Sequence, residues 1–483
     1  VESAFADADH ITRVELPMPR VAINPMEPRA ALGSYDAIED RYTLYSGNQF
    51  PHDMRSWLAD AVLGIAESQL RVVSPDMGGS FGLRANIFPE IPLVLWAARK
   101  LGRPVKWRNE RSDSILDEQA RDMIMAVELA LDGDGQFLAL RVRSLANMGA
   151  YLSNFGPLPA FGNMGGVAGV YLTPAIHAEV LGVFTNTSPT GPYRGAGRPE
   201  VAFAIERTID LIANERGLDP ADVRFRNMIT ADQMPYTVGL PYRDGVMMEY
   251  DSGDYPKALR TALDELGGLE AIRARQRKAL EEGRYLGLGL GCYVEGTGIG
   301  PFEGATVKID PTGKIMVATG ACPQGQGHET AFAQVAADIW GVPLEDVVVT
   351  VADTSHVTMG YGTIASRSAV TGSGAIKDSS DKVKEKVFAI AANVLEASET
   401  DLELRDGKVG VKGVPEMSMT LREVARAAAP GWANQRPEGV EAGLEGTAYY
   451  EPPTVTWAYA ANAAIVEIDT DTGQVKIERY VEV

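Results

Sequence analysis

Cysteine is nearly absent from this 483-residue chain, which contains only Cys292 and Cys322. Two thiols are too few for a disulfide scaffold or an iron–sulfur site, so any iron–sulfur cluster must lie on another chain. Long apolar runs are also lacking. No stretch approaches the roughly 18 apolar residues that cross a bilayer, and the first residues do not resemble a secretory leader. We therefore expect a cytoplasmic protein.

Basic residues are fewer than acidic residues. Lys and Arg number 45 against 65 Asp and Glu, which gives a formal net charge of -20. An acidic surface repels nucleic acid and anionic membranes, so we expect neither as a partner, although a local basic loop can still bind phosphate. The hydrophobic share of 45% and the charged share of 23% are typical of globular proteins. The length predicts two or more domains.

The most distinctive motif is the turn at residues 192–200, Pro-Tyr-Arg-Gly-Ala-Gly-Arg-Pro-Glu. Its glycines, Gly195 and Gly197, allow positive φ and close approach of the backbone to a ligand. Its arginines add two cationic groups, and the helix expected to follow directs N–H groups at the turn. The motif predicts an anion or oxyanion site. For one such turn alone, a tight connection with solvated arginines is the commoner explanation.

Three further glycine-containing polar loops accompany this turn. Residues 77–82 follow an apolar strand pattern, residues 324–330 open a predicted helix, and residues 361–369 form a polar loop. Four such loops on one chain predict a single large ligand with many contacts.

Hairpin and helix patterns recur in both halves of the chain. Hairpins with Asp/Gly turns are expected at residues 125–145, 305–319, 402–411 and 465–483. Amphipathic spacing predicts helices at residues 54–68, 89–101, 200–217, 254–266, 268–282, 329–340 and 380–399. The repetition indicates two related α+β domains, at 1–245 and 286–483, joined by a helical connector at 246–285. Because the chain lacks an initial Met and stops within a strand pattern, we expect a fragment of a longer protein.

Five motifs in order resemble the molybdenum-binding large subunit of the xanthine dehydrogenase and aldehyde oxidase family. They are Gln49-Phe50-Pro51-His52 and the residues at 78–82, 192–197, 325–330 and 361–368, and the segment at 24–30 is similar too. The resemblance implies two molybdopterin-binding domains with β-hairpins and flanking helices. It also implies molybdenum held by the pterin dithiolene, without a direct protein ligand.

The resemblance implies roles for individual residues. Gln49 matches a glutamine that donates a hydrogen bond to an oxo ligand of molybdenum, Phe81 shapes the site, and Arg194 steadies negative charge on the substrate. The implied cofactor-binding residues are Gln49, Gly79, Ser80, Phe81, Gly82, Arg194, Gly195, Ala196, Gly325, Gln326, Gly327, His328, Thr363, Ala365, Ser366, Arg367 and Ser368.

Other residues near these motifs fit structural roles from their type alone. This applies to His52 and also to His328. Glu329 fits a first helical turn better than a catalytic base. Cys322 fits a buried thiol.

The implied reaction is hydroxylation of an aldehyde or an N-heterocycle, with water as the oxygen source. Gly195 stands where carbon monoxide dehydrogenases of this family carry cysteine, and Ala85 stands where purine-oxidising members carry glutamate, so both of those substrates are disfavoured. The implied cofactor is molybdopterin cytosine dinucleotide. The implied partners are an FAD subunit and a [2Fe-2S] subunit in a dimer of heterotrimers.

The resemblance places the general-base glutamate and an N-terminal domain outside this chain, so we expect the fragment alone to be inactive. A non-catalytic molybdopterin-binding or assembly subunit is the alternative. A nicotinamide dehydrogenase is excluded because no G-x-G-x-x-G follows a first strand with an acidic residue about 20 positions later.

Overall fold

The computed structural model describes residues 1–117, 119–162, 164–242, 244–432 and 434–483. The chain forms two compact units, each assembled from separate stretches of sequence. Unit 1 contains Val1–Ile23, Leu116–Thr297 and Thr456–Val483, and unit 2 contains Asn24–Ile115 and Gly298–Val455. The predicted boundaries at 245 and 285 follow the order of the sequence and stay a prediction.

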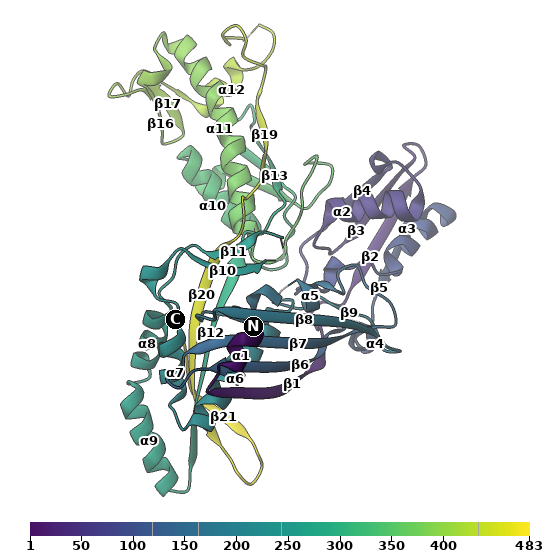
Figure 1. Ribbon diagram of the computed structural model, residues 1–483. Helices are drawn as coiled ribbons and strands as arrows, with labels where there is room; N and C mark the ends of the chain where they lie inside the picture. Colours follow the sequence, from purple (N-terminus) through teal and green to yellow (C-terminus); the bar gives the residue numbers. More distant parts are fainter. Residues whose placement is uncertain (118, 163, 243, 433) are drawn as a thin grey trace. The chain divides into compact units, whose positions relative to one another are not determined.

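A sheet of long strands forms one part of unit 1 (Figure 1). Its order is β1 (His10–Ala22), β6 (Gln119–Leu131), β7 (Phe137–Gly149) and β8 (Ala175–Phe184), and the short β9 (Thr190–Gly191) pairs with β6. The predicted hairpin between β6 and β7 is confirmed: the amide of Gln136 donates to the Asp132 carboxylate at 2.8 Å, and Gly135 has a positive φ. The helices of this part are α1 (Glu2–Ala6), α4 (Arg111–Asp117, shared with unit 2), α5 (Leu158–Phe161), α6 (Arg198–Arg216) and α7 (Pro220–Asn227).

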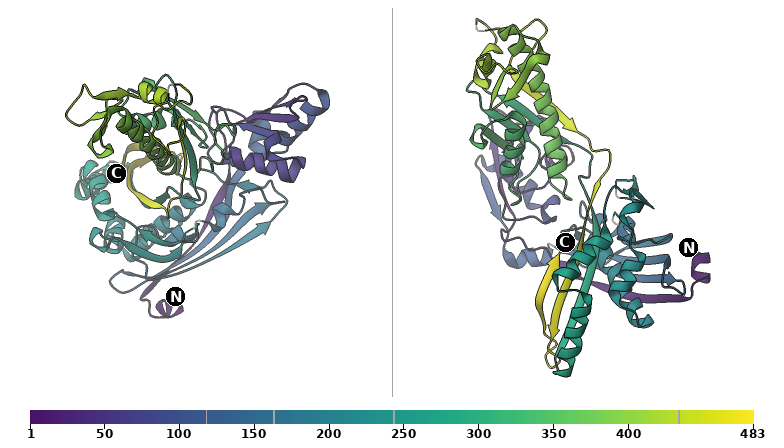
Figure 2. Two further views of the ribbon diagram at one scale, coloured as in Figure 1. Left: turned by 90° about the horizontal axis from the view of Figure 1, so that it is seen from above. Right: turned by 90° about the vertical axis from the view of Figure 1, so that its left-hand side faces the viewer.

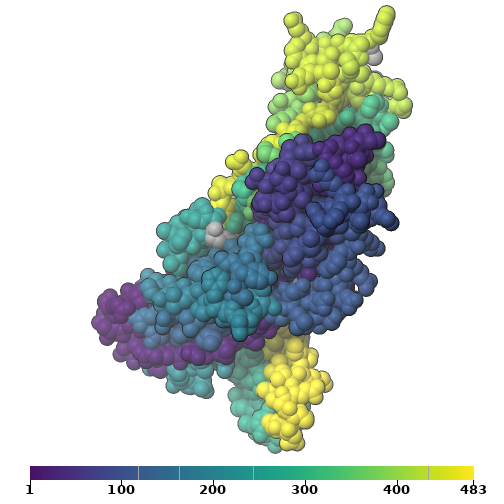
Figure 3. All heavy atoms as spheres, turned by 90° about the vertical axis from the view of Figure 1, so that its right-hand side faces the viewer, coloured from purple at the N-terminus to yellow at the C-terminus, as the bar shows by residue number. Residues whose placement is uncertain are grey.

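The second part of unit 1 is a long antiparallel ribbon. β12 (Tyr285–Thr297) pairs with β20 (Thr456–Ile468), which pairs with β21 (Val475–Glu482). Helices α8 (Tyr255–Glu265) and α9 (Leu269–Glu281) lie along this ribbon (Figure 2). The turn of the β20–β21 hairpin, in yellow, lies on the surface (Figure 3). A small pair of strands, β10 (Tyr236–Pro241) and β11 (Met247–Tyr250), completes the unit.

A buried charged cluster fixes helix α6, whose first turn follows the 192–197 motif. Arg224 is 0% exposed and donates from Nε to Glu206 Oε2 at 2.9 Å. The hydroxyl of Tyr171 donates to the other oxygen of Glu206, and Arg224 Nη2 donates to the carbonyl of Leu290 at 3.3 Å. Buried charges persist only when they are paired and hydrogen-bonded. The cluster therefore ties α6 to α7 and β12.

Unit 2 contains a first four-stranded sheet with the order β4-β3-β2-β5. The strands are β2 (Ala30–Asp36), β3 (Arg41–Ser46), β4 (Leu70–Val73) and β5 (Val105–Arg108), and the helices that accompany them are α2 (Pro51–Ser56) and α3 (Glu90–Leu101). Leu44, Leu58, Val72 and Leu95 are buried between these elements. The helix predicted at 54–68 is wrong at both ends: the helical run begins at Pro51, continues as a π-helical segment at Trp57–Leu63 and stops at Gly64, which has a positive φ.

The second sheet of unit 2 has the order β15-β14-β13-β19. Its strands are β13 (Glu303–Ile309), β14 (Ile315–Thr319), β15 (Val347–Val351) and β19 (Leu444–Tyr450). The helices α10 (His328–Trp340), α11 (Ser368–Leu395) and α12 (Leu421–Ala427) and the small sheet of β16 (Leu402–Arg405), β17 (Lys408–Val411) and β18 (Ser418–Thr420) complete it. Trp340, Ile376 and Val387 lie in its apolar core.

Helix α11 begins much earlier than the sequence predicts, at Ser368 instead of residue 380. Its first turns contain Gly372 and Gly374, which disfavour a helix by propensity. A Cβ atom at Gly372 would lie 2.7 Å from the ring of Phe332, and one at Gly374 would lie 2.6 Å from the ring of Tyr450. Close packing therefore requires these glycines and overrides their weak propensity. The polar loop predicted at 361–369 consequently ends at Arg367.

The α+β class and the two related cofactor-binding domains are confirmed. The predicted hairpins at 305–319 and 402–411 and the helices at 89–101, 200–217, 254–266, 268–282 and 329–340 are present, within one or two residues at their ends. The hairpin predicted at 465–483 is also present, but its first strand begins at Thr456, earlier than predicted. Within the described ranges, no helix combines the length and the apolar character needed to cross a membrane.

Candidate functional site

Gln49 lies at the centre of a hydrogen-bond network in unit 2. It follows β3, precedes α2 and is 4% exposed. Its Nε2 donates to the carbonyl of Thr363 at 2.9 Å, and its Oε1 accepts from Ser80 Oγ at 2.6 Å. The amide of Thr363 in turn donates to the Gln49 carbonyl at 3.0 Å. The network thus joins three of the five motifs, at residues 49–52, 78–82 and 361–368.

The turn at residues 79–82 has a backbone that few residues adopt easily. Gly79, Phe81 and Gly82 have φ values of 99°, 57° and 107°. Positive φ is costly for a residue with a side chain, so surrounding contacts must hold Phe81 in place. Arg84, which is 3% exposed, donates from Nε to the Gly79 carbonyl at 3.0 Å. The ring of Phe81 stays 43% exposed.

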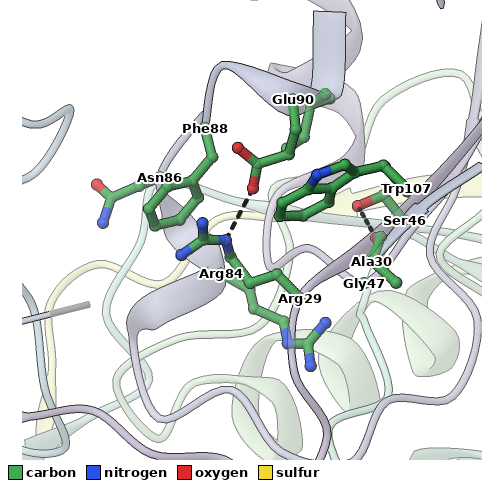
Figure 4. A pocket seen from close by; sticks show the side chains of 11 residues that line it. Arg29, Ala30, Ser46, Gly47, Arg84, Asn86, Phe88, Glu90 and Trp107 are labelled. Carbon is green, nitrogen blue, oxygen red and sulfur yellow. Dashed lines mark hydrogen bonds and ion pairs between the residues drawn. The ribbon is translucent and has the colours of Figure 1, made fainter. Parts of the chain in front are cut away.

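The segment at residues 24–29 supports this turn from outside. The amide of Glu27 donates to the Gly78 carbonyl at 3.2 Å, and the Glu27 carbonyl accepts from Arg84 Nη2 at 2.8 Å. Figure 4 shows Arg29 paired with Glu90, and the Nε–Oε1 distance is 2.9 Å. The guanidinium of Arg29 also lies 3.5 Å from the centre of the Phe88 ring. These contacts give the 24–30 segment a structural role beside the turn.

A fully buried ion pair holds the loop at residues 360–368. Glu303 and Arg367 are both 0% exposed, and Arg367 Nη1 lies 2.9 Å from Glu303 Oε2. The same carboxylate accepts from the amides of Gly362 at 3.0 Å and Tyr361 at 3.3 Å. Burial raises the pKa of Glu303, while Arg367 and the amide donors oppose that shift. The Glu303 carboxylate therefore holds the loop in place through the Tyr361 and Gly362 amides and Arg367.

The residues predicted from the sequence do not include Glu303, and they include Arg367 as an implied cofactor-binding residue. The only sequence signal for Glu303 is an acidic residue at the start of a hairpin, which is a common pattern. Arg367 also donates to the carbonyls of Ile299 and Gly362, at 2.9 Å and 2.6 Å. Its guanidinium is thus bound to the chain itself, and we expect it to position the loop rather than to contact a ligand.

Three glycines allow the loops of unit 2 to touch. A Cβ atom at Gly320 would lie 2.6 Å from the Cα of Gly360 and 2.8 Å from Glu303 Oε1. A Cβ atom at Gly362, where φ is 113°, would lie 2.0 Å from the Gln49 carbonyl oxygen. No larger residue fits these positions without displacing backbone. The sequence does not predict this role, in which glycines permit close approach between loops of the protein itself.

The loop at residues 320–328 joins the same network through Thr363. The amide of Cys322 donates to Thr363 Oγ1 at 2.8 Å, and Thr363 Oγ1 lies 3.0 Å from Ser368 Oγ. Gln324 Nε2 donates to the Thr363 carbonyl at 2.8 Å. Gln324 is absent from the predicted site residues, whereas the predicted Gln326 is exposed and accepts from the Gln324 amide at 2.9 Å.

The histidine and cysteine beside this loop are buried. His328 opens α10, is 6% exposed and stacks on Phe332 with ring centres 5.4 Å apart. Burial lowers the pKa of His328 and favours its neutral form. Burial raises the pKa of the Cys322 thiol, which keeps it unreactive. His52 is buried as well, and its Nε2 lies 2.9 Å from the Val357 carbonyl.

The turn at residues 192–197 lies in unit 1, and its two arginines differ. Gly195, Ala196 and Gly197 have positive φ values of 86°, 48° and 101°. Arg194 is exposed. Arg198 instead forms an ion pair with Glu295, and its Nε donates to the Tyr242 hydroxyl at 3.0 Å. Arg198 is thus bound within the protein, and a role of Arg194 toward a ligand stays a prediction.

A cavity of about 280 Å³ lies beside the same turn within unit 1. Gly195, Val201, Ile205, Tyr242 and Trp457 contribute to its largely apolar lining. Protein interiors contain few voids larger than a water molecule, so a cavity of this size can accommodate a small apolar molecule.

Comparisons with known proteins agree with this architecture. Two family profiles, both described as molybdopterin cofactor-binding domain, match residues 1–228 and 262–483. The carbon monoxide dehydrogenase large chain of Afipia carboxidovorans is 35% identical over 99% of this chain and 60% of that protein. The 6-hydroxypseudooxynicotine dehydrogenase complex subunit gamma of Paenarthrobacter nicotinovorans is 36% identical, with the same coverage of 99% and 60%.

Among solved structures, quinoline 2-oxidoreductase from Pseudomonas putida 86 has a TM-score of 0.91 and 36% sequence identity, covering 99% of this chain and 62% of that chain. The fold and the two domain matches define a molybdopterin-binding protein. The chain belongs to the molybdenum-binding large subunits of the xanthine dehydrogenase and aldehyde oxidase family, so the family resemblance is confirmed. It spans about 60% of the length of these curated relatives.

Proposed function

We propose that this chain forms the cofactor-binding part of a molybdenum-dependent hydroxylase that oxidises an aldehyde or an N-heterocycle with water as the oxygen source. The observation that carries the proposal is the Gln49 side-chain amide. One N–H donates to Thr363, and the second donates to no acceptor among the residues that the structure describes. A buried N–H donor needs an acceptor, and an oxo ligand supplies one.

The residues of unit 2 fit the dithiolene-bearing pterin that the family carries. Gly325 and Gly327 have positive φ, and no atom lies near the Cβ position of either, so their backbone is open to a ligand. Ser366 lies just before α11, and Ser368 is the first residue of that helix. The hydroxyl and N–H donors at this helix start suit a phosphate group. When bound, molybdopterin cytosine dinucleotide would supply a metal centre that takes up two electrons. The exposed ring of Phe81 would shape the space beside it.

The apolar cavity and the turn of unit 1 support an organic substrate. Gly195 lines this cavity and carries no thiol, which disfavours oxidation of carbon monoxide. Ala85 has no carboxylate, which disfavours a purine. Arg194 is exposed and would steady negative charge that develops on a carbonyl oxygen or a ring nitrogen.

The names of two relatives, a large chain and a subunit gamma, describe parts of multi-subunit complexes. By this likeness we propose an FAD subunit and a [2Fe-2S] subunit as electron-accepting partners, in a dimer of heterotrimers. The alternative is a non-catalytic molybdopterin-binding or assembly subunit. It predicts the same loops and cofactor without turnover.

The test uses the natural complex that contains this chain. We expect purified complex to contain molybdenum and, after acid treatment, to release cytidine monophosphate, and we expect it to reduce a dye with an aldehyde or an N-heterocycle but not with carbon monoxide or xanthine. Oxygen from labelled water should appear in the product. Cofactor without turnover of any of these compounds would favour the assembly alternative. Complex prepared with its cofactor genes but free of molybdenum would refute both proposals.

A further inference from the structure

We propose that Ser80 is a positioning residue whose hydroxyl orients the amide of Gln49, so that an N–H group rather than the carbonyl oxygen is presented to the cofactor. The inference rests on the proposed function. The family resemblance gives Ser80 only as part of a cofactor-contacting turn, whereas the geometry points to an indirect role through Gln49.

The hydroxyl of Ser80 has a defined direction. Ser80 is 1% exposed, and its Oγ lies 2.6 Å from Gln49 Oε1. The same Oγ accepts from the amide of Arg84 at 3.3 Å. Because that amide can only donate, the hydroxyl proton is left for Gln49. Arg84 is itself held by the Gly79 carbonyl, so the turn fixes the place from which Ser80 donates.

The Gln49 amide is also fixed at its nitrogen. The Thr363 carbonyl can only accept, so the atom that faces it at 2.9 Å must be Nε2. Reversing the amide would place its oxygen against a carbonyl oxygen and its nitrogen against a hydroxyl. The two contacts therefore agree on one orientation, which leaves the second N–H of Gln49 for an acceptor outside the described chain.

Ser80 is needed because Thr363 holds the amide only partly. The Thr363 carbonyl accepts from Gln324 Nε2 at 2.8 Å as well as from Gln49. Without the Ser80 hydroxyl, Gln49 Oε1 would be buried without a donor among the residues that the structure describes, and rotation of the terminal amide would relieve that loss. Rotation would move the second N–H away from its acceptor.

The experiment compares three variants of the natural complex. Ser80→Ala removes the hydroxyl, Ser80→Thr keeps it, and Ser379→Ala is the matched control. Ser379 is 0% exposed and its Oγ donates to the Ala305 carbonyl at 2.8 Å, so its loss also removes a buried hydrogen bond, but one made from the middle of helix α11. The readouts are molybdenum content, melting temperature, the Mo(V) electron paramagnetic resonance spectrum, kcat and KM.

We expect Ser80→Ala to lower kcat by about tenfold with little change in KM, and to shift the Mo(V) spectrum, because one hydrogen bond to the metal's oxygen ligand is misdirected. Ser80→Thr should restore both. Ser379→Ala should lower the melting temperature without changing either. If Ser80→Ala does not fold, Ser80→Cys, whose thiol is a weak donor, is measured in its place and should change both readouts in the same direction.

A normal spectrum and a normal kcat in Ser80→Ala would overturn the proposal, and so would a change in melting temperature alone. A parent complex that contains molybdenum but lacks turnover would refute the proposed function while leaving the spectrum as a test of Ser80. A parent complex without molybdenum would refute the proposed function and the inference together.

Discussion

Replacing Glu303 with glutamine tests whether a buried charge organises the loops of unit 2. The change keeps the shape of the side chain but removes the negative charge opposite Arg367, which is 0% exposed. Removing one partner of a buried ion pair leaves an uncompensated charge and costs about 3–5 kcal/mol. The amides of Tyr361 and Gly362 also lose part of a charged acceptor. We therefore expect a loss at the upper end of this range.

The assay is denaturant unfolding followed by tryptophan fluorescence, to which Trp340, fully buried in the core of unit 2, contributes together with the other five tryptophans of the chain. The matched control is Glu467→Gln in unit 1. Glu467 forms a two-point contact with Arg284, at 2.7 Å and 2.9 Å, but the side chains are 27% and 45% exposed. Exposed pairs contribute about 0–1 kcal/mol, so this variant should be nearly as stable as the parent.

A double-mutant cycle separates the ion pair from the packing around it. Arg367→Met alone leaves the Glu303 carboxylate buried without its cation and should cost about as much as Glu303→Gln. The double variant contains no uncompensated charge, so its loss should be smaller than the sum of the two single losses by about 2 kcal/mol or more. A loss below about 1 kcal/mol for Glu303→Gln, or additive losses in the cycle, would refute the reasoning.

Two further predictions concern the same unit. Gly362→Ala would place a Cβ atom 2.0 Å from the Gln49 carbonyl oxygen at a φ of 113°, so we expect the purified complex to lose most of its molybdenum; Gly267→Ala, at a φ of 101° with open space around it, is the control and should cost only about 1–2 kcal/mol without loss of metal. Burial lowers the folded-state pKa of His52 and His328 below the usual 6.5, so the unfolded chain takes up protons first and stability should fall as pH drops below about 6.5 toward the folded pKa values. Unfolding measured from pH 7.5 to 5.5 should show this slope, and His52→Asn should reduce it; an equal slope in that variant would contradict the assignment.

Local sequence signals predicted the elements whose determinants are close in the chain. The β6–β7 hairpin was predictable because Asp132 and Gly135, which form its turn, lie within four consecutive residues of the sequence. Helix α10 was predictable from its apolar spacing. The start of α11 was not, because Gly372 and Gly374 are poor helix formers and only their contacts with Phe332 and Tyr450 explain them. Propensity is local, whereas this packing is not.

The candidate site likewise contains residues that the sequence identified and residues that it missed. The order of the motifs identified Gln49, the 79–82 turn and the 363–368 loop, because residue types suited to an oxo- and phosphate-rich ligand occur there in a familiar order. It did not identify Glu303, which lies outside every distinctive motif, and it did not select Gln324 although that residue opens the 324–330 loop. Each of the two residues acts through a loop about 40 to 60 residues away in the sequence. Arg194 and Arg198 look equivalent in sequence, and only the contact with Glu295 distinguishes them.

The sequence by itself determined that this chain is an acidic α+β protein of the molybdenum hydroxylase family with glycine-rich polar loops. Composition, turn residues and motif order can each be recognised from short stretches of the sequence. Only the tertiary structure decided which loops meet. Gln49 and Thr363 are 314 residues apart and yet share two hydrogen bonds, and that pairing depends on the chain returning to the same place through the folding of whole sheets. Hydrogen bonds are short-ranged and directional, so the partners of each buried donor are fixed only once the backbone is in place.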